Sequence, residues 1–341
     1  MHGLDPQNRD FADFLLTATR EIWEGRGLTA RAQAYYHPDV ILRGAEGVQF
    51  GARAVAEDAM ATLVSLPDRR LLGEDVIWCE DPEGATETSD AFLSSHRLIC
   101  TATHSHPGMY GAPTGRRVAY RILADCAIRE DAVYDEWLVR DQSAILSQLG
   151  FDVVDWTRDL ISREGGPEAC VPPMTPATDV AGPYDRRGND SEWGQRYAEV
   201  ISAIMAAEMN VIPRAYDRAV SLHYPGGQDG LGWGDADRFW MGLRAAFPTA
   251  DFRIEHVMGR EDPLMPPRAA VRWSLHGTHS GWGRFGRPTG AEVYIMGISH
   301  ADFGPFAGSG AWGDPTVRRE FTLIDETAIW KQILLQTGAH E

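Results

Sequence analysis

The chain repeats itself, and this feature constrains its fold more than any other. Residues 101–115 read TATHSHPGMYGAPTG and align without a gap with residues 276–290, HGTHSGWGRFGRPTG. The shared pattern is T-H-S-x-x-G-x-aromatic-G-x-P-T-G. Residues 51–68 also resemble 234–251, and 141–148 resemble 325–332. Similarity of this extent within one chain predicts two copies of one domain.

The repeat sets the expected domain boundaries. A length of 341 residues suits two domains of ordinary size. We expect the first domain at 9–150 and the second at 192–338. Residues 151–191 include GGPEACVPPMTPATDVAGP, whose Pro and Gly content predicts an irregular connector. The second copy carries an insertion in the Gly-rich stretch 304–315, which is expected to close the second pocket or to pack on the neighbouring domain.

Both copies show the same order of predicted elements. An amphipathic helix comes first, then a short strand, a second helix and four strand-like runs. The P-T-G segment links the second and third runs as a hairpin turn. The fold class is therefore α+β, with helices before a long antiparallel sheet. The four runs are expected at 70–79, 91–106, 117–128 and 132–141, and again at 251–259, 269–281, 291–303 and 317–325.

These features together resemble a known family. The first helix, WEGRGLTARAQAYYHPDVILRG, the T-H-S strand, the G-x-P-T-G turn and the D-x-x-x-x-L-x-x-L-G ending resemble the SnoaL-like polyketide cyclases of the nuclear-transport-factor-2-like (NTF2-like) superfamily. The resemblance implies cone-shaped domains, each a curved antiparallel sheet wrapped by helices around an apolar pocket. It also implies that the two copies form an intramolecular pseudo-dimer, and it leaves a further homodimer open. The resemblance further implies a cofactor-free catalyst that uses an Asp/His acid–base pair.

Composition excludes several kinds of partner. The net charge of −17 disfavours a nucleic acid as partner. No apolar run approaches the roughly 18 residues that a membrane helix needs. The first residues lack a signal-peptide pattern, so a cytoplasmic location is expected. The four cysteines have no metal-type spacing, and we expect neither a metal nor a cofactor. His104 and His106 alone share a strand face in a way that leaves a metal alternative open.

Ionisable residues at equivalent positions of the two copies are the candidate catalytic groups. His104 and His279 alternate with apolar residues, so they are expected to point inward as pocket bases or donors, or to brace the turn. Asp125 and His300 interrupt apolar strands, where a lone charge is costly unless it is paired or functional. The alternative places them on the outer face of the sheet or in the interface between the two domains.

Asp141 and Asp325 end the last strand of each copy. A helix follows each of them, so they are expected to cap that helix or to serve as the pocket carboxylate that the resemblance implies. His300 with Asp325 is the one His/Asp pairing in these late strands, which makes the second copy the stronger catalytic candidate. Asp125 and Asp141 take these places in the first copy, where two carboxylates in different environments could divide the acid and base roles.

Other residues are expected to contact substrate or to face outward. His256 alternates with apolar residues and is expected in the pocket or at the edge of the core. Glu136 and Glu320 correspond to each other and are expected to face outward. The residues predicted to bind substrate are Tyr35, Trp137, Tyr216, His256 and Trp273.

The sequence thus predicts a cofactor-independent acid–base enzyme. Its partner would be a small, largely apolar carbonyl metabolite that undergoes cyclisation, isomerisation or dehydration. Asp325 or His300 would remove the proton, and His279 would orient the carbonyl. The alternative is a non-catalytic protein that binds a small molecule in the same pocket.

Overall fold

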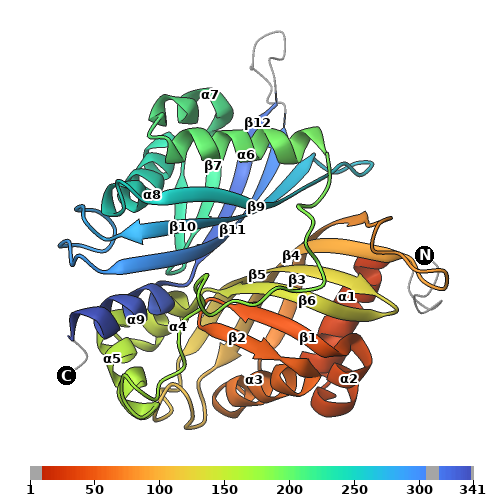
Figure 1. Cartoon of the computed structure of the whole chain (residues 1–341), viewed down its shortest axis with the longest axis horizontal. Coiled ribbons are helices and arrows are strands. Elements are labelled where there is room, and N and C mark those ends of the chain that lie inside the picture. The colour runs from red at the N-terminus through yellow and green to blue at the C-terminus, as the bar shows by residue number, and fades with distance from the viewer. Residues whose placement is uncertain (1–9, 305–314, 339–341) are drawn as a thin grey trace. The chain divides into compact units, whose positions relative to one another are not determined.

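The computed structural model describes residues 10–304 and 315–338, which form two compact units (Figure 1). Each unit contains one six-stranded sheet. The first unit consists of the residues through Trp156 together with Val171–Arg186, and the second of Thr157–Cys170 with the residues from Arg187 onward. The pseudo-dimer stays a prediction.

The two sheets have the same topology, which confirms the α+β prediction. The strand orders are β2-β1-β6-β5-β4-β3 and β8-β7-β12-β11-β10-β9. Neighbouring strands are antiparallel except for β1–β6 and β7–β12, which are parallel. The sequence predicted an antiparallel sheet and therefore missed the parallel strand pair of each unit. It also missed the short strands β2 and β8.

In each unit the helices pack against the sheet, as Figure 1 shows for α3 below the first sheet and α6 beside the second. The strands of the first unit are β1 (Tyr36–Gly44), β2 (Gly47–Phe50), β3 (Arg70–Glu80), β4 (Ala91–Thr103), β5 (Arg117–Arg129) and β6 (Ala132–Arg140). Its helices are α1 (Phe11–Thr19), the π-helix η1 (Arg20–Glu24), α2 (Leu28–Tyr35), α3 (Gly51–Ser65) and α4 (Gln142–Leu149), and α5 (Val153–Arg163) follows in the connector.

The second unit repeats this plan. Its strands are β7 (Tyr216–Tyr224), β8 (Gln228–Leu231), β9 (Asp251–Arg260), β10 (Arg268–Thr278), β11 (Glu292–Gly304) and β12 (Thr316–Ile324). Its helices are α6 (Glu192–Met205), the 3₁₀ helix η2 (Met209–Val211), α7 (Ile212–Ala215), α8 (Trp233–Ala246) and α9 (Glu326–Thr337).

The P-T-G segments form the predicted turns between β4 and β5 and between β10 and β11. Gly115 and Gly290 have φ values of 69° and 77°, a left-handed conformation that glycine adopts at little cost. The backbone N–H of Gly115 donates to the carbonyl of His104, and that of Gly290 to the carbonyl of His279. The repeated motif therefore encodes one closed turn twice.

The connector is divided between the two units. Its segment Val171–Arg186 belongs to the first unit, where the Asp179 carboxylate lies 2.6 Å from the Arg43 guanidinium. Arg43 also pairs with Asp135, and both side chains are almost fully buried. Glu164, from the other part of the connector, pairs with Lys331 of the second unit at 2.5 Å. The segment predicted as one irregular strap thus contains a helix and completes both units.

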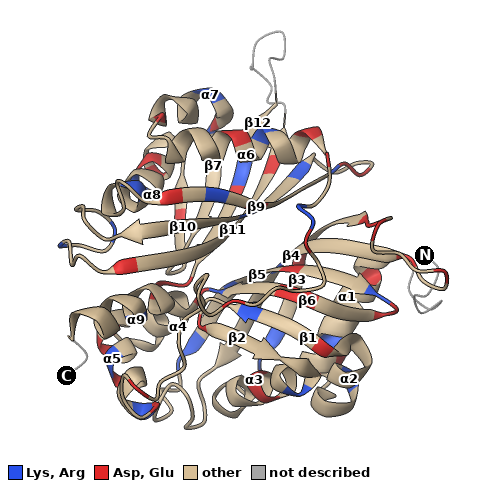
Figure 2. Cartoon of the chain, in the orientation of Figure 1, with Lys and Arg blue, Asp and Glu red and all other residues tan. Residues whose placement is uncertain are grey.

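Acidic and basic residues are interspersed over the helices and strands of both units (Figure 2). No helix within the described ranges is long and apolar enough to cross a membrane. Of the predicted loop at 304–315, residues 305–314, including Trp312, lie outside the described residues.

Candidate functional site

An interior cavity of about 60 Å³ lies in the first unit, between its helices and its sheet. Much of its wall is apolar and includes Phe14, Ile22, Leu98 and Ile122. Apolar cavities with a few convergent polar groups are the usual form of small-molecule sites. The polar and ionisable residues of the wall are Thr19, Tyr35, Tyr36, Asp58, Arg69, His96, Cys126, Glu136 and Arg140.

Glu136, on β6, is the buried carboxyl group of this cavity. Its exposed fraction is 3%, and the hydroxyl of Tyr36 donates a hydrogen bond to it. Burial raises the pKa of Glu136 to about 7, and the negative charge of Asp58 adds to the shift, whereas the Tyr36 hydrogen bond opposes it. The prediction that Glu136 faces outward is therefore wrong. The group can gain or lose a proton near neutral pH, as general acid–base catalysis requires.

His96, on β4, supplies a second titratable group to the cavity wall. It is buried, and its Nδ1 atom makes no hydrogen bond to any described residue. Burial lowers the pKa of His96 to about 4, although the charge of Asp125 opposes the shift. The imidazole is thus neutral at pH 7 and has an unused polar atom.

Two arginines and the carboxylate of Asp58 line the same cavity. The Arg140 guanidinium donates to Asp58 at 2.9 Å. Arg69, which directly precedes β3, has an exposed fraction of 4%. Two nitrogens of the Arg69 guanidinium, Nε and one terminal nitrogen, have no hydrogen-bond partner among the described residues. The wall therefore carries more positive than negative charge when Glu136 is protonated.

The opposite pKa shifts of Glu136 and His96 predict opposite effects of pH on stability. The folded pKa of Glu136 is above its usual 4.5, so its contribution is complete below pH 4.5 and is lost as pH rises to about 7. The folded pKa of His96 is below its usual 6.5, so its contribution is absent at about pH 4 and grows up to pH 6.5. Each change amounts to about 3 kcal/mol of unfolding free energy.

Single variants should separate the two effects. Between pH 4.5 and 7, His96→Gln should make the unfolding free energy fall with pH relative to wild type, because Glu136 then acts unopposed. Glu136→Gln should make it rise, because His96 then acts unopposed. Urea unfolding at a series of pH values measures both slopes. Parallel pH curves for the two variants and the wild type would contradict these protonation states.

His104 and His279, the histidines of the repeated motif, brace their turns. The Nδ1 atom of His104 lies 3.2 Å from the Thr114 hydroxyl, and that of His279 lies 3.0 Å from the Thr289 hydroxyl. Both rings are fully buried, and burial lowers the pKa of each. Neither residue lines the cavity. Their geometry corresponds to the bracing alternative that the sequence left open.

Asp125 and His300 lie on the sheet face that points away from the helices. On β5 the cavity is lined by Ala124 and Cys126, so Asp125 between them points to the other face, where Ser95 donates to its carboxylate. His300 is paired in the sheet with Phe321, next to the inward Glu320. The outer-face alternative thus describes both residues.

Asp141 and Asp325 are helix caps. Asp141 accepts a hydrogen bond from the backbone N–H of Ala144 at the start of α4. Asp325 accepts from Thr327 and Ala328 at the start of α9. Each carboxylate thereby satisfies amides that the helix itself leaves unpaired.

A β-bulge places His256 on the face opposite to the prediction. The register shifts between Arg272 and Trp273, so Trp273 pairs with Ile254 and Arg272 pairs with His256. Strict alternation from Ile254 would have put His256 on the core side. One extra residue in the strand reverses the faces, which corrects the expectation that His256 faces the pocket.

Of the residues predicted to bind substrate, Tyr35 lines the first-unit cavity. Its hydroxyl donates to Glu21 at 2.9 Å. Trp137 lies beside the Arg43 guanidinium, on the face opposite to the neighbouring Glu136. Tyr216 and Trp273 are fully buried in the core of the second unit.

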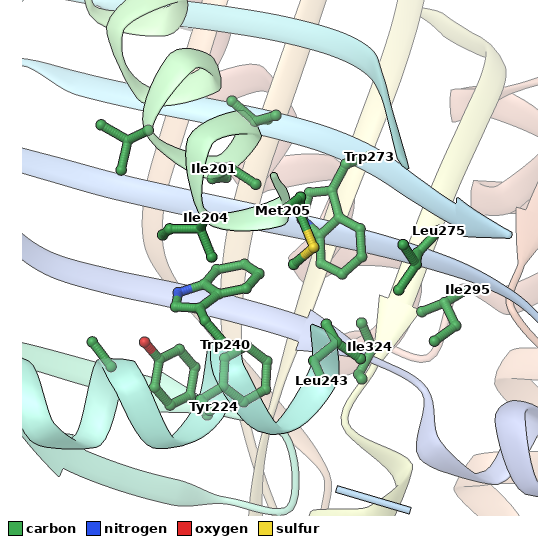
Figure 3. Close-up of a cluster of buried hydrophobic side chains, with 14 of the residues drawn as sticks. Ile201, Ile204, Met205, Tyr224, Trp240, Leu243, Trp273, Leu275, Ile295 and Ile324 are labelled. Atoms are coloured by element: carbon green, nitrogen blue, oxygen red, sulfur yellow. The ribbon is translucent and has the colours of Figure 1, made fainter. Parts of the chain in front are cut away.

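In the second unit, aromatic side chains occupy the space that corresponds to the cavity. Glu320, at the position of Glu136, is fully buried and accepts hydrogen bonds from Tyr197, Tyr216 and Tyr224 at 2.6–2.7 Å. Burial raises its pKa. Figure 3 shows Trp240 and Trp273 packed among aliphatic side chains in this core. The second copy, which the sequence favoured for catalysis, thus has a tightly filled interior around its inward carboxyl group.

Paired strands show how Trp273 fits. Trp273 faces Gly297 across β10 and β11, whereas the equivalent pair in the first unit is Leu98 and Ile122. A Cβ atom on Gly297 would lie 2.2 Å from the Trp273 ring. The indole N–H donates to the Ser299 hydroxyl at 3.0 Å. Glycine therefore makes room for an indole where the first unit keeps two cavity-lining aliphatic residues.

Sequence reasoning missed the polar cavity residues of the first unit. It compared ionisable residues that both copies share, whereas most of these cavity groups have apolar counterparts. That difference between the copies is the signal that could have found them. Asp58, Arg69, His96 and Arg140 have Phe239, Ala250, Val271 and Ile324 at the equivalent positions.

The fold and the cavity together define an α+β pocket protein with two NTF2-like domains. A family model of SnoaL-like polyketide cyclases matches residues 14–149, and a model of SnoaL-like domains matches residues 195–304. The chain is a tandem member of the SnoaL-like family, as the repeated motif predicted.

Solved structures resemble one domain each. IdmH of Streptomyces antibioticus, a candidate polyketide cyclase, is 19% identical, with 41% of this chain and 97% of IdmH covered and a TM-score of 0.35. TsrD of Streptomyces laurentii is 16% identical, with coverage of 43% and 98% and a TM-score of 0.34. A SnoaL-like polyketide cyclase of Agrobacterium tumefaciens is 17% identical, with coverage of 42% and 98% and a TM-score of 0.31. No curated protein matches the chain at a significant level.

Proposed function

We propose that the first domain is a cofactor-independent acid–base catalyst for a small, largely apolar carbonyl compound, with Glu136 as the group that moves the proton. The observation that carries the proposal is a buried carboxyl group on the wall of an apolar cavity. Its pKa of about 7 suits proton transfer at neutral pH. Membership of the SnoaL-like family supports a cyclase-type role.

The proposed chemistry begins with removal of a proton next to the carbonyl group. The Glu136 carboxylate takes the proton, and the electron pair of the C–H bond moves toward the carbonyl oxygen. Arg140 and His96, which line the same cavity, donate hydrogen bonds to the developing negative charge. Return of the proton to another carbon gives isomerisation. Attack of the enolate carbon on a second carbonyl, with the proton passing to the new alkoxide, gives cyclisation, and loss of a hydroxyl group as water gives dehydration.

The charged and titratable groups around Glu136 come from several elements. Tyr36 lies on β1, Asp58 on α3, Arg69 at β3, His96 on β4, Cys126 on β5 and Arg140 on β6. Burial keeps the pKa of Cys126 and of Tyr36 well above their usual values, so neither group competes for the proton near pH 7.

Proton exchange in D₂O tests the proposal without a known substrate. The wild-type chain should catalyse exchange at the carbon next to the carbonyl of aryl and cyclic ketones such as 2-tetralone, followed by NMR. The rate should rise with pH through an apparent pKa of about 7 as Glu136 ionises. A ketone that binds but shows no enzyme-dependent exchange would overturn catalysis and favour the alternative, a small-molecule binding protein.

A further inference from the structure

Arg69 differs from the other buried arginines of the first unit because it has no partner. Arg43 pairs with Asp135 and Asp179, and Arg140 with Asp58. Arg69 is buried, with only 4% of the residue exposed to solvent. Among residues 10–304 and 315–338, its side chain has neither an ion pair nor a hydrogen-bond acceptor. A buried charge without a partner is costly. The guanidinium group is therefore placed to receive an anion.

The position of Arg69 lets it contact a bound molecule. Besides the interior cavity, it lines an open pocket of about 740 Å³ on the same unit. The wall of this outer pocket also carries Arg26, Arg70 and Arg117, against the acidic groups Glu24 and Asp68. Asp68 accepts hydrogen bonds from Thr103, and Glu24 accepts one from the backbone of Leu71. The outer pocket is thus positively charged in a chain of net charge −17.

The repeat supplies an internal comparison. The backbone N–H of Arg69 donates to the carbonyl of Leu66 at the end of α3, and that of Ala250 donates to Phe247 at the end of α8. The two positions are equivalent, but the second unit has alanine there and a filled interior. An arginine is thus present at this position in the unit that has the cavity and absent in the other unit.

We propose that Arg69 binds a carboxylate group of the ligand, so that the first domain takes an apolar carboxylic acid whose body extends from the outer pocket toward Glu136. A guanidinium group and a carboxylate form paired, charge-assisted hydrogen bonds. The proposal specifies the chemical class of the ligand. It rests on the proposed function only in requiring that the cavity bind a small molecule. It does not require Glu136 to act as a base.

Paired probes of equal shape test the proposal on the full-length chain. Benzoate and 2-naphthoate should bind at least about tenfold more tightly than benzamide and 2-naphthamide, measured by calorimetry. Arg69→Gln should abolish this preference. The matched control Arg53→Gln should keep it, because Arg53 is an exposed arginine of α3 that lines neither pocket. Arg69→Lys, which keeps the charge, should keep part of it and serves if the glutamine variant fails to fold.

Three outcomes would overturn the assignment. They are equal affinity for acid and amide, a preference that survives in Arg69→Gln, and no binding of either acid at millimolar concentration. Inorganic phosphate that binds as tightly as 2-naphthoate would indicate a free-anion site and would likewise overturn the carboxylic acid class. Glu136→Gln should still prefer the acids. A wild-type chain that prefers the acids but catalyses no proton exchange would refute the proposed function alone.

Discussion

Glu136→Gln is expected to lower the rate of enzyme-catalysed proton exchange by about 10²–10⁴-fold, the usual contribution of a general base. Glutamine keeps the size of the side chain and can accept the Tyr36 hydrogen bond, but it cannot take up a proton. The ligand affinity should change much less than the rate. NMR exchange kinetics under saturating ketone measure the rate, and calorimetry measures the affinity.

The repeat offers a matched control for this variant. Glu320→Gln changes the equivalent carboxyl group, which lies among three tyrosines rather than on the cavity wall. It should leave exchange unchanged at temperatures where both units are folded. A loss below tenfold for Glu136→Gln, or an equal loss for Glu320→Gln, would place the chemistry elsewhere.

Trp273→Ala is expected to lower the unfolding free energy of the second unit by about 3–5 kcal/mol. The side chain is fully buried and lies 6.0 Å from the Trp240 ring and 5.9 Å from the Phe252 ring, between centroids. Its removal also leaves the Ser299 hydroxyl without the indole donor. Urea unfolding followed by circular dichroism measures the change.

A second tryptophan serves as the reference for this measurement. Trp282 lies in the hairpin after β10 with an exposed fraction of 70%. Trp282→Ala should change the unfolding free energy by no more than about 0.5 kcal/mol. A cost below about 1 kcal/mol for Trp273→Ala would mean that the interior of the second unit is not closely packed.

The sequence predicted the fold well because the repeat and the P-T-G turn depend on local backbone geometry. Faces of strands were harder to predict. Both Glu136 and its neighbour Trp137 are buried, so alternation of polar and apolar residues carried no information on β6. The extra residue in β9 reversed His256, and no glycine marks this bulge in the sequence.

The site depended on contacts between distant residues. Asp58 comes from an ordinary helix and Arg69 from the turn after it, so nothing in the sequence distinguishes either of them from a surface charge. Their place on a cavity wall follows from how α3 packs on the sheet. The roles of Asp141 and Asp325, in contrast, depend on local sequence. A helix start was visible after each of them, and in the structure each caps that helix.

The divided connector has a consequence for anyone who separates the two halves of the gene. A fragment that stops at residue 150 would lose Asp179 and the backbone N–H of Tyr184, which contact the buried Arg43–Asp135 pair. It would also lose Met174, whose backbone N–H bonds to Ala45 beside β1. A fragment for expression should therefore extend through Arg186. The boundary of the first folded unit thus lies beyond the end of the sequence repeat, and a fragment has to be cut at the former.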